Sequence, residues 1–190
     1  IGRNSSQQLG GVGTHGYVEV ESRSINIDRL QQSWLTLLRS HPMLRACYTE
    51  DGKQYVLPEP PHPTILVHDL TKMDESTREE ALLSTRERLS HRLLDIATGH
   101  VVSLEVSLLP QDVAVIHFDI DLLVCDVQSF QIILHDLAHH YATGEAPDAD
   151  PSWSFARYLA GHAREGVADI DRDQAYWRLS LIHISEPTRP

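Results

Sequence analysis

The sequence of 190 residues predicts a mixed α/β sandwich, in which helices pack against a sheet of parallel and antiparallel strands. Three observations support this fold class. Strand-like runs and long helical patterns alternate along the chain. The dipeptide Asp51-Gly52 joins two strand-like runs, which is typical of an antiparallel hairpin. Hydrophobic residues make up 41% of the sequence, which suits a buried core at this length.

The first elements are a strand and an amphipathic helix. Residues 17–21 alternate apolar and acidic side chains, as a strand with one solvated face does. Asn26 or Asp28 can then cap a helix. Its apolar residues recur at i, i+4, i+7 and i+8 and form one stripe that faces the core: Leu30, Trp34, Leu37 and Leu38.

A hairpin follows this helix. Pro42 ends the helix, and residues 43–48 resume as a strand. The Asp51-Gly52 turn leads to a return strand at 54–57, and a proline-rich connector follows it.

The remaining elements continue the mixture of strands and helices. A charged helix is predicted from about 75 to 93, with Leu82, Leu83, Leu89 and Leu93 on its buried side. The others, in chain order, are strands at 65–67, 101–109 and 113–118, a helix at 127–141, a surface loop at 143–152, and helices at 155–159 and 169–178.

Composition excludes several classes of function. The net charge is −11, from 16 basic and 27 acidic residues, and no basic stripe is present, so nucleic acid is not an expected partner. No apolar run approaches the roughly 18 residues of a membrane helix, and no signal-peptide pattern occurs. We therefore expect a soluble, cytoplasmic protein without a membrane partner. Cys47 and Cys125 are expected to be free, buried thiols.

The stretch after the strand at 113–118 carries the candidate site. This short β-branched run predicts a central strand, and acidic residues follow it where the pattern is otherwise apolar. Asp126 can simply cap the next helix, with Ser129 in its first turn. Alternatively, Asp121 and Asp126 form a functional pair, because carboxylates at a strand-to-helix junction often point into a cleft.

The sequence Asp121-Leu-Leu-Val-Cys-Asp126-Val-Gln-Ser129 resembles the D-x-x-x-x-D-x-x-S signature of heterocyclization domains of nonribosomal peptide synthetases. Ordinary condensation domains have H-H-x-x-x-D-G there. Other stretches resemble the family in the same order: Ile1-Gly-Arg3, Leu9-Gly-Gly-Val12 with His15 and Tyr17, Trp34 to Arg45 (with Ser40 at a usual arginine), Leu89-Ser-His91, Ser154-Phe155, Tyr158-Leu159 and Tyr176-Trp177. The resemblance covers residues 1–178, about half of a full domain.

The resemblance implies one lobe of a fold like that of chloramphenicol acetyltransferase, in which two lobes enclose a tunnel. It implies no directly bound cofactor, because substrates arrive on the phosphopantetheine of carrier-protein domains. An acyl or peptidyl thioester is condensed with a tethered Cys, Ser or Thr, and loss of water then closes a thiazoline or oxazoline. The partners implied are carrier proteins, an adjacent adenylation domain and the missing C-terminal lobe. Residues 179–190 resemble a sequencing-adapter read-through, so we expect them to be non-native.

The resemblance also implies roles for the site residues. Asp121 stands where the first histidine of the condensation motif lies, so it is the candidate to face the tunnel and move protons or orient a nucleophile. Asp126 is expected to be buried and architectural, paired with Arg45. Ser129 is expected to support the start of the helix.

Other interpretations are weaker. His139-His140 lacks the aspartate of a condensation motif, and His135 with His139 has no third ligand. His117, Asp119 and Asp121 would share one strand face but offer no further ligands, so no metal site is predicted. A non-catalytic lobe that only binds carrier proteins remains the alternative function. A stand-alone acyltransferase of this fold would need a histidine where Asp121 lies.

Overall fold

The computed structural model describes residues 14–146, 154–165, 172–174 and 176–178. The chain divides into two compact units, residues 1–149 and 150–190. The first unit contains these elements: β1 (His15–Arg23), α1 (Ile27–Ser40), the 3-10 helix η1 (Pro42–Arg45), β2 (Ala46–Tyr48), β3 (Gln54–Val56), β4 (Leu66–Asp69), α2 (Glu75–His91), β5 (Val102–Leu109), β6 (Val113–Asp121) and α3 (Val127–Thr143). The second unit contains α4 (Phe155–Glu165).

The main sheet has the strand order β1-β6-β5-β4. β6 is hydrogen-bonded to β1 and β5, antiparallel to both, so the prediction of a central strand is confirmed. β4 is parallel to β5, which makes the sheet mixed. β2 and β3 form a separate hairpin at the predicted turn, where Gly52 has a φ of 80°. The expected mixed α/β class is therefore correct.

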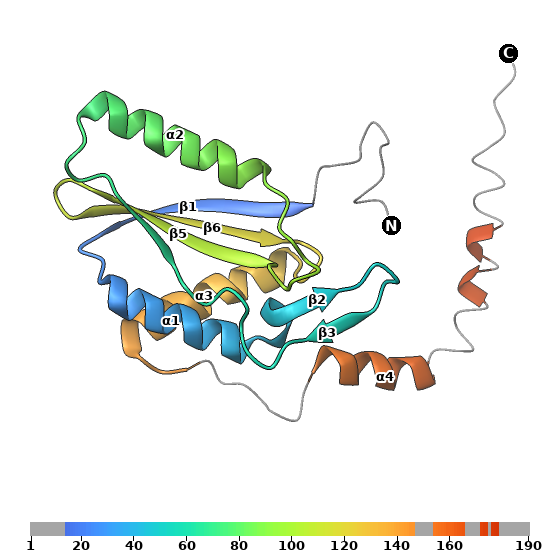
Figure 1. The fold of residues 1–190 in the computed structure, drawn as a ribbon. Coiled ribbons are helices and arrows are strands. Elements are labelled where there is room, and N and C mark those ends of the chain that lie inside the picture. Colours follow the sequence, from blue (N-terminus) through green and yellow to red (C-terminus); the bar gives the residue numbers. More distant parts are fainter. Residues whose placement is uncertain (1–13, 147–153, 166–171, 175, 179–190) are drawn as a thin grey trace, which may run out of the picture. The chain divides into compact units, whose positions relative to one another are not determined.

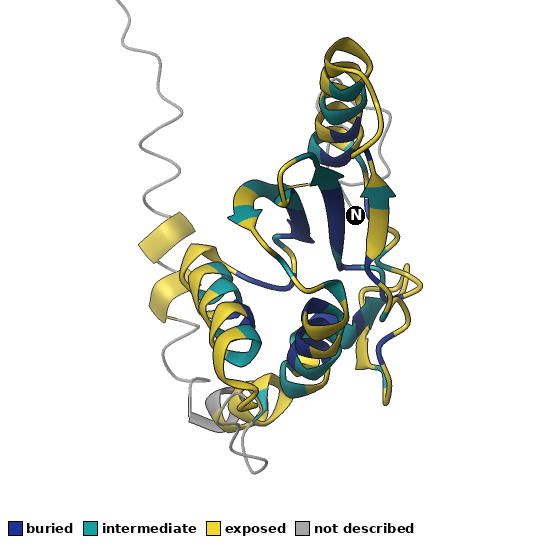
Figure 2. Cartoon of the chain, turned by 90° about the vertical axis from the view of Figure 1, so that its left-hand side faces the viewer, coloured by how far each residue is buried: buried dark blue, intermediate teal, exposed yellow. Residues whose placement is uncertain are grey.

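The sheet lies between two helical layers (Figure 1). α1 and α3 cover one face, and α2 lies over the other. Buried residues are concentrated in the strands and on the inward sides of α1 and α3, whereas most of α2 is exposed (Figure 2).

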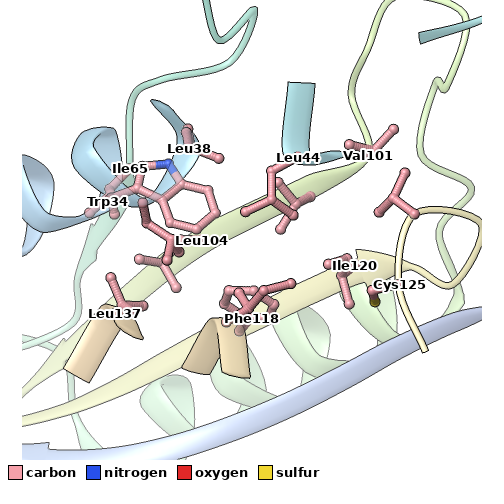
Figure 3. Close-up of a cluster of buried hydrophobic side chains, with 14 of the residues drawn as sticks. Trp34, Leu38, Leu44, Ile65, Val101, Leu104, Phe118, Ile120, Cys125 and Leu137 are labelled. Carbon is pink, nitrogen blue, oxygen red and sulfur yellow. The ribbon is translucent and has the colours of Figure 1, made fainter. Parts of the chain in front are cut away.

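The face toward α1 and α3 is apolar. Trp34 is 1% exposed and its ring meets that of Phe118 edge to face, with centroids 5.9 Å apart. Figure 3 shows the cluster around this contact, with Leu38, Leu104 and Ile120 among its members. The predicted stripe of α1 is fully buried here, so the helical pattern identified its core face correctly.

The structure decides one open alternative and corrects one local prediction. Asn26, not Asp28, is the N-cap of α1, and its side chain accepts a hydrogen bond from the backbone of Arg29. The strand predicted from residue 43 begins only at Ala46, because Pro42–Arg45 form η1. Proline fixes φ at a helical value and needs no N–H partner in a first turn, so Pro42 starts this helical turn after ending α1.

The predicted buried side of α2 is also wrong in part. Leu89 is fully buried, but Leu83 is 50% exposed and Leu93 is 46% exposed. Leu93 lies beyond α2, which ends at His91. The sheet face under α2 is polar, and Arg86 and Arg88 of α2 bind its Glu19 and Glu105.

Several predictions fall wholly or partly outside the described residues. Those on 1–13 and 179–190 do so entirely, as does most of the loop at 143–152. Of the helix predicted at 169–178, the described positions 172–174 and 176–178 are helical. The helix predicted at 155–159 extends to Glu165. No helix among the described residues is long and apolar enough to cross a bilayer.

Candidate active site

Asp121 is the last residue of β6, the central strand. Its side chain is buried, with 2% of the residue exposed. Its backbone N–H donates to the carbonyl of Val101 at 2.9 Å, and its Oδ1 accepts a hydrogen bond from the N–H of Leu123 at 3.0 Å. A buried carboxylate is costly unless it has partners, so these contacts fix where the side chain can lie.

Asp126 lies at the other end of the short loop and has a different environment. It is exposed and is the N-cap of α3, where Oδ1 accepts a hydrogen bond from the backbone N–H of Ser129 at 2.7 Å. This hydrogen bond lowers the pKa of the Asp126 carboxyl. The interpretation of Asp126 as a helix cap with Ser129 in the first turn is therefore confirmed.

The predicted pairing of Asp126 with Arg45 is wrong. Arg45 donates to backbone carbonyls instead, with contacts to Leu38 at 3.0 Å, Pro58 at 3.1 Å and also Leu57. Its guanidinium thereby joins the end of α1 to the segment after β3. Asp126 is solvated, so it needs no buried counter-ion, and the premise of the pairing fails.

The charge of Asp121 affects the pKa values of two neighbouring groups, Tyr48 and Cys125. Burial, and then the charge of Asp121, raises the pKa of Tyr48 to about 12. Burial, followed by the charges of Asp126 and Asp121, raises the pKa of Cys125 to about 11. The hydroxyl of Tyr48 lies 3.5 Å from the carbonyl of Leu123. Tyr48 and Cys125, which both stay protonated at neutral pH, therefore lie near enough to Asp121 for its charge to raise their pKa values.

The sheet face under α2 carries a row of charged and polar side chains. Glu105 of β5 is 4% exposed and accepts hydrogen bonds from Arg88 at 3.0 and 2.7 Å, and it lies 2.7 Å from Nε2 of His68. Burial alone would raise the pKa of Glu105, but the hydrogen bonds from Arg88 and His68 outweigh it and lower the pKa to about 2.

His117 of β6 is part of the same row. Tyr17 donates its single hydroxyl proton to Glu19 at 2.6 Å, so Nδ1 of His117 donates to the Tyr17 oxygen at 2.8 Å. Nε2 then accepts from the hydroxyl of Ser107 at 3.0 Å. Arg86 of α2 completes the group through two hydrogen bonds to Glu19, at 2.8 and 2.6 Å.

His117, Asp119 and Asp121 do share a strand, but their partners are protein groups. Within the described part of the chain, no three His, Cys, Asp or Glu side chains are arranged to hold a metal ion. The rings of His135 and His139 stack with centroids 6.3 Å apart and gain no third ligand there.

Sequence reasoning missed Arg92 and Glu105. Both contribute to the polar layer under α2, and Arg92 binds the buried Asp119. A signal was available. In β5 the polar residues Ser103, Glu105 and Ser107 alternate with apolar ones, which predicts a strand with one polar face.

The described fold and this strand–loop–helix site define a class of protein. Residues 14–188 match the family model of the condensation domain, and the chain belongs to this family. The chain is 34% identical to phenyloxazoline synthase MbtB of Mycolicibacterium paratuberculosis, over 98% of this chain and 16% of that protein. It is 29% identical to pyochelin synthetase PchE of Pseudomonas aeruginosa, over 93% of this chain and 12% of that protein.

A solved structure supports the same assignment. The cyclization-docking bidomain of the nonribosomal peptide synthetase EpoB from Sorangium cellulosum superposes with a TM-score of 0.84 and 25% identity, over 96% of this chain and 37% of that one. The chain thus spans a small part of the relatives that it matches. Its homologues are of the heterocyclization type, as its aspartate motif indicates.

Proposed function

We propose that residues 1–178 are the N-terminal half of a heterocyclization domain of a nonribosomal peptide synthetase. The complete domain would condense a carrier-bound acyl or peptidyl thioester with a tethered Cys, Ser or Thr. It would then lose water to form a thiazoline or oxazoline. Its substrates would arrive on phosphopantetheine arms of carrier proteins, and an adenylation domain would lie next to it in the synthetase.

The observation that carries this proposal is the placement of Asp121. A carboxylate that is 2% exposed, at the end of the central strand and near enough to raise the pKa values of Tyr48 and Cys125, is suited to proton transfer or to orienting a nucleophile. The relatives named above are synthases and synthetases, and one is called a phenyloxazoline synthase. Asp126 would support the site by starting α3 directly after the loop.

The test uses the complete domain with both carrier proteins loaded. Asp121→Asn keeps the size and one hydrogen-bond acceptor of the side chain but removes its charge. We expect ring formation, followed by mass spectrometry of the carrier-bound product, to fall by at least about 100-fold, the usual contribution of a general acid or base. Thermal unfolding should stay close to that of the wild type.

Unchanged turnover in Asp121→Asn would remove Asp121 from the site. The 190-residue chain alone is expected to form no ring, because the proposed tunnel needs both lobes; thiazoline or oxazoline formation by it would refute this part of the proposal. A lobe that only binds carrier proteins would bind them equally well but give no product in the complete wild-type domain.

A further inference from the structure

α2 covers the polar face of the sheet with little apolar contact of its own. Leu89 is the one buried apolar residue in this helix, all of which is described, and Ala81 and Leu82 are half-buried. The outer side of α2 is exposed along its length (Figure 2). α1, on the opposite face, is shorter but buries three leucines and Trp34. Since burial of an apolar face is what usually holds a helix in place, α2 lacks most of that contribution.

Ion pairs take the place of apolar packing under α2. Three arginines at the end of the helix reach three different strands, and each donates two hydrogen bonds of 2.6–3.0 Å to one carboxylate. The pairs are Arg86 with Glu19 of β1, Arg88 with Glu105 of β5, and Arg92 with Asp119 of β6. Such forked contacts are the strongest that a guanidinium and a carboxylate form, so they fix where α2 lies.

Water and salt can reach these ion pairs. The side chains of Arg86 and Arg88 are about half exposed, although Glu105 beneath them is buried. Salt therefore weakens the contacts, because the screening length falls from about 10 Å at 0.1 M to about 3 Å at 1 M. If α2 lifts away, the charged groups on both sides regain water, which offsets much of the lost attraction. An apolar layer such as that under α1 gains nothing comparable when it opens.

The chain on either side of α2 is anchored in the core. Before the helix, Leu70 is 6% exposed, and its N–H donates to the carbonyl of Leu108 at 3.0 Å. After the helix, Leu94 is 3% exposed. The segment between these two leucines is therefore tethered at both ends, while its middle is held mainly by charged side chains.

We propose that α2 is a salt-sensitive cover, which undocks as one unit between Leu70 and Leu94 while the sheet, α1 and α3 stay folded. Proteins open locally in cooperative units, and those with few buried apolar contacts open at the lowest free energy. Opening of α2 gives water access to the polar face of β1, β5 and β6, where His117 and Glu105 are otherwise buried. The inference concerns the packing of this lobe and does not depend on the proposed function.

The test is backbone amide hydrogen exchange in the complete domain, followed by mass spectrometry of peptides from α2 and α1. At 0.1 M NaCl, amides beyond the first turn of α2 should exchange at least about 10-fold faster than those of α1. Raising NaCl to 1 M should accelerate exchange in α2 by about 3-fold or more and leave α1 unchanged, because screening acts on the ion pairs and not on apolar packing.

A matched pair of variants tests the ion pairs directly. Arg88→Gln removes the contact with Glu105 and should accelerate exchange in α2 but not in α1. Arg78→Gln is the control on the same helix. Its guanidinium donates to the carbonyl of Met73 at 3.3 Å and to no residue of the sheet that the structure describes, so exchange should not change.

Equal exchange rates in α2 and α1, with equal responses to salt, would overturn the inference, because α2 would then open only when the whole lobe unfolds. Fast exchange in α2 that salt and Arg88→Gln leave unchanged would overturn it as well, since the ion pairs would not be what holds the helix. If Arg88→Gln does not fold, the salt series on the wild type decides alone.

Discussion

The hydroxyl oxygen of Tyr17 lies 2.8 Å from Nδ1 of His117 on the neighbouring strand, and burial of this histidine ring lowers its pKa. His117 is 1% exposed, and its Nε2 accepts from Ser107. Both ring nitrogens therefore have hydrogen-bond partners, and Nε2 can accept a hydrogen bond only in the uncharged imidazole. Protonation would turn Nε2 into a donor, so the Ser107 hydroxyl would have to exchange its role as donor for that of acceptor.

His117 should make the stability of the domain depend on pH near neutrality. Burial lowers its pKa from 6.5, despite the opposing charge of Glu19. The unfolded chain therefore binds a proton at higher pH than the folded chain. The stabilisation is complete above pH 6.5 and is lost as the pH falls below it.

The measurement is the free energy of unfolding between pH 8 and pH 5. His117→Gln, which keeps a polar side chain but cannot titrate, should flatten the decline below pH 6.5 relative to the wild type. His91→Gln, at an exposed position of α2, is the control and should keep the decline. A wild-type slope that survives in His117→Gln would contradict this assignment.

Glu105 should dominate the response to stronger acid. Its pKa is lowered from 4.5 to about 2, so its contribution is present above pH 4.5 and is lost as the pH falls toward 2. A shift of this size corresponds to about 3 kcal/mol. Glu105→Gln should be destabilised at neutral pH, because Arg88 and His68 lose their anionic partner, and its stability should vary less below pH 4.5.

Acid titration followed by circular dichroism measures this effect. Glu59→Gln removes a carboxylate whose side chain is 68% exposed, and it should behave like the wild type. Equal acid sensitivity of Glu105→Gln and the wild type would show that other carboxylates control acid unfolding.

Asp126 should contribute to stability as a helix cap and independently of Arg45. Asp126→Ala should cost about 1 kcal/mol, whereas Asp126→Asn keeps the acceptor for the N–H of Ser129 and should cost much less. Arg45→Gln should be destabilising through its lost carbonyl contacts. Because the two side chains share no partner, the effects of Asp126→Ala and Arg45→Gln should add to within about 0.5 kcal/mol. If urea denaturation gave a coupling free energy well above that value, the two side chains would interact after all, as an ion pair between Asp126 and Arg45 requires.

Gly99 lies in the loop before β5 and should resist substitution more strongly than Gly52. Both have φ near +80°, so alanine is strained at either position by about 1 kcal/mol or more. At Gly99 an added Cβ would also lie 2.8 Å from Cδ1 of Leu57 and 3.2 Å from Cγ of Pro61, whereas at Gly52 nothing lies within 4 Å. Gly99→Ala should therefore melt at a lower temperature than Gly52→Ala. Equal melting temperatures would show that Leu57 and Pro61 can move aside at little cost.

The elements whose apolar residues follow one regular spacing, or form one continuous run, could be predicted from the sequence. The stripe containing Trp34 faces one apolar layer, and β6 is buried on both faces, so periodicity alone locates them. The partners of Arg45 could not be predicted, because they are backbone carbonyls from two separate segments, α1 and the chain after β3, and side-chain patterns do not show which carbonyls are free to accept. The aspartate motif indicated the candidate site, but it did not show that Asp121 is buried and Asp126 exposed.

The exposure of Leu83 was not predictable for a related reason. Its helix packs on a sheet face whose polar side chains come from β1, β5 and β6, and two of these strands follow the helix in the chain. Helical periodicity shows which side of a helix is apolar, but it does not show whether the surface that the helix packs on is apolar or polar.

The two faces of this sheet should show different patterns of substitution among homologous sequences. On the side of α1 and α3, substitutions need only conserve volume, so positions such as Leu104 and Phe118 can drift among apolar residues. On the side of α2, a change of charge at Glu105 or Asp119 leaves an arginine without its partner. Those positions should therefore change together with Arg88 and Arg92, so that one strand carries two patterns of covariation, one in size and one in charge.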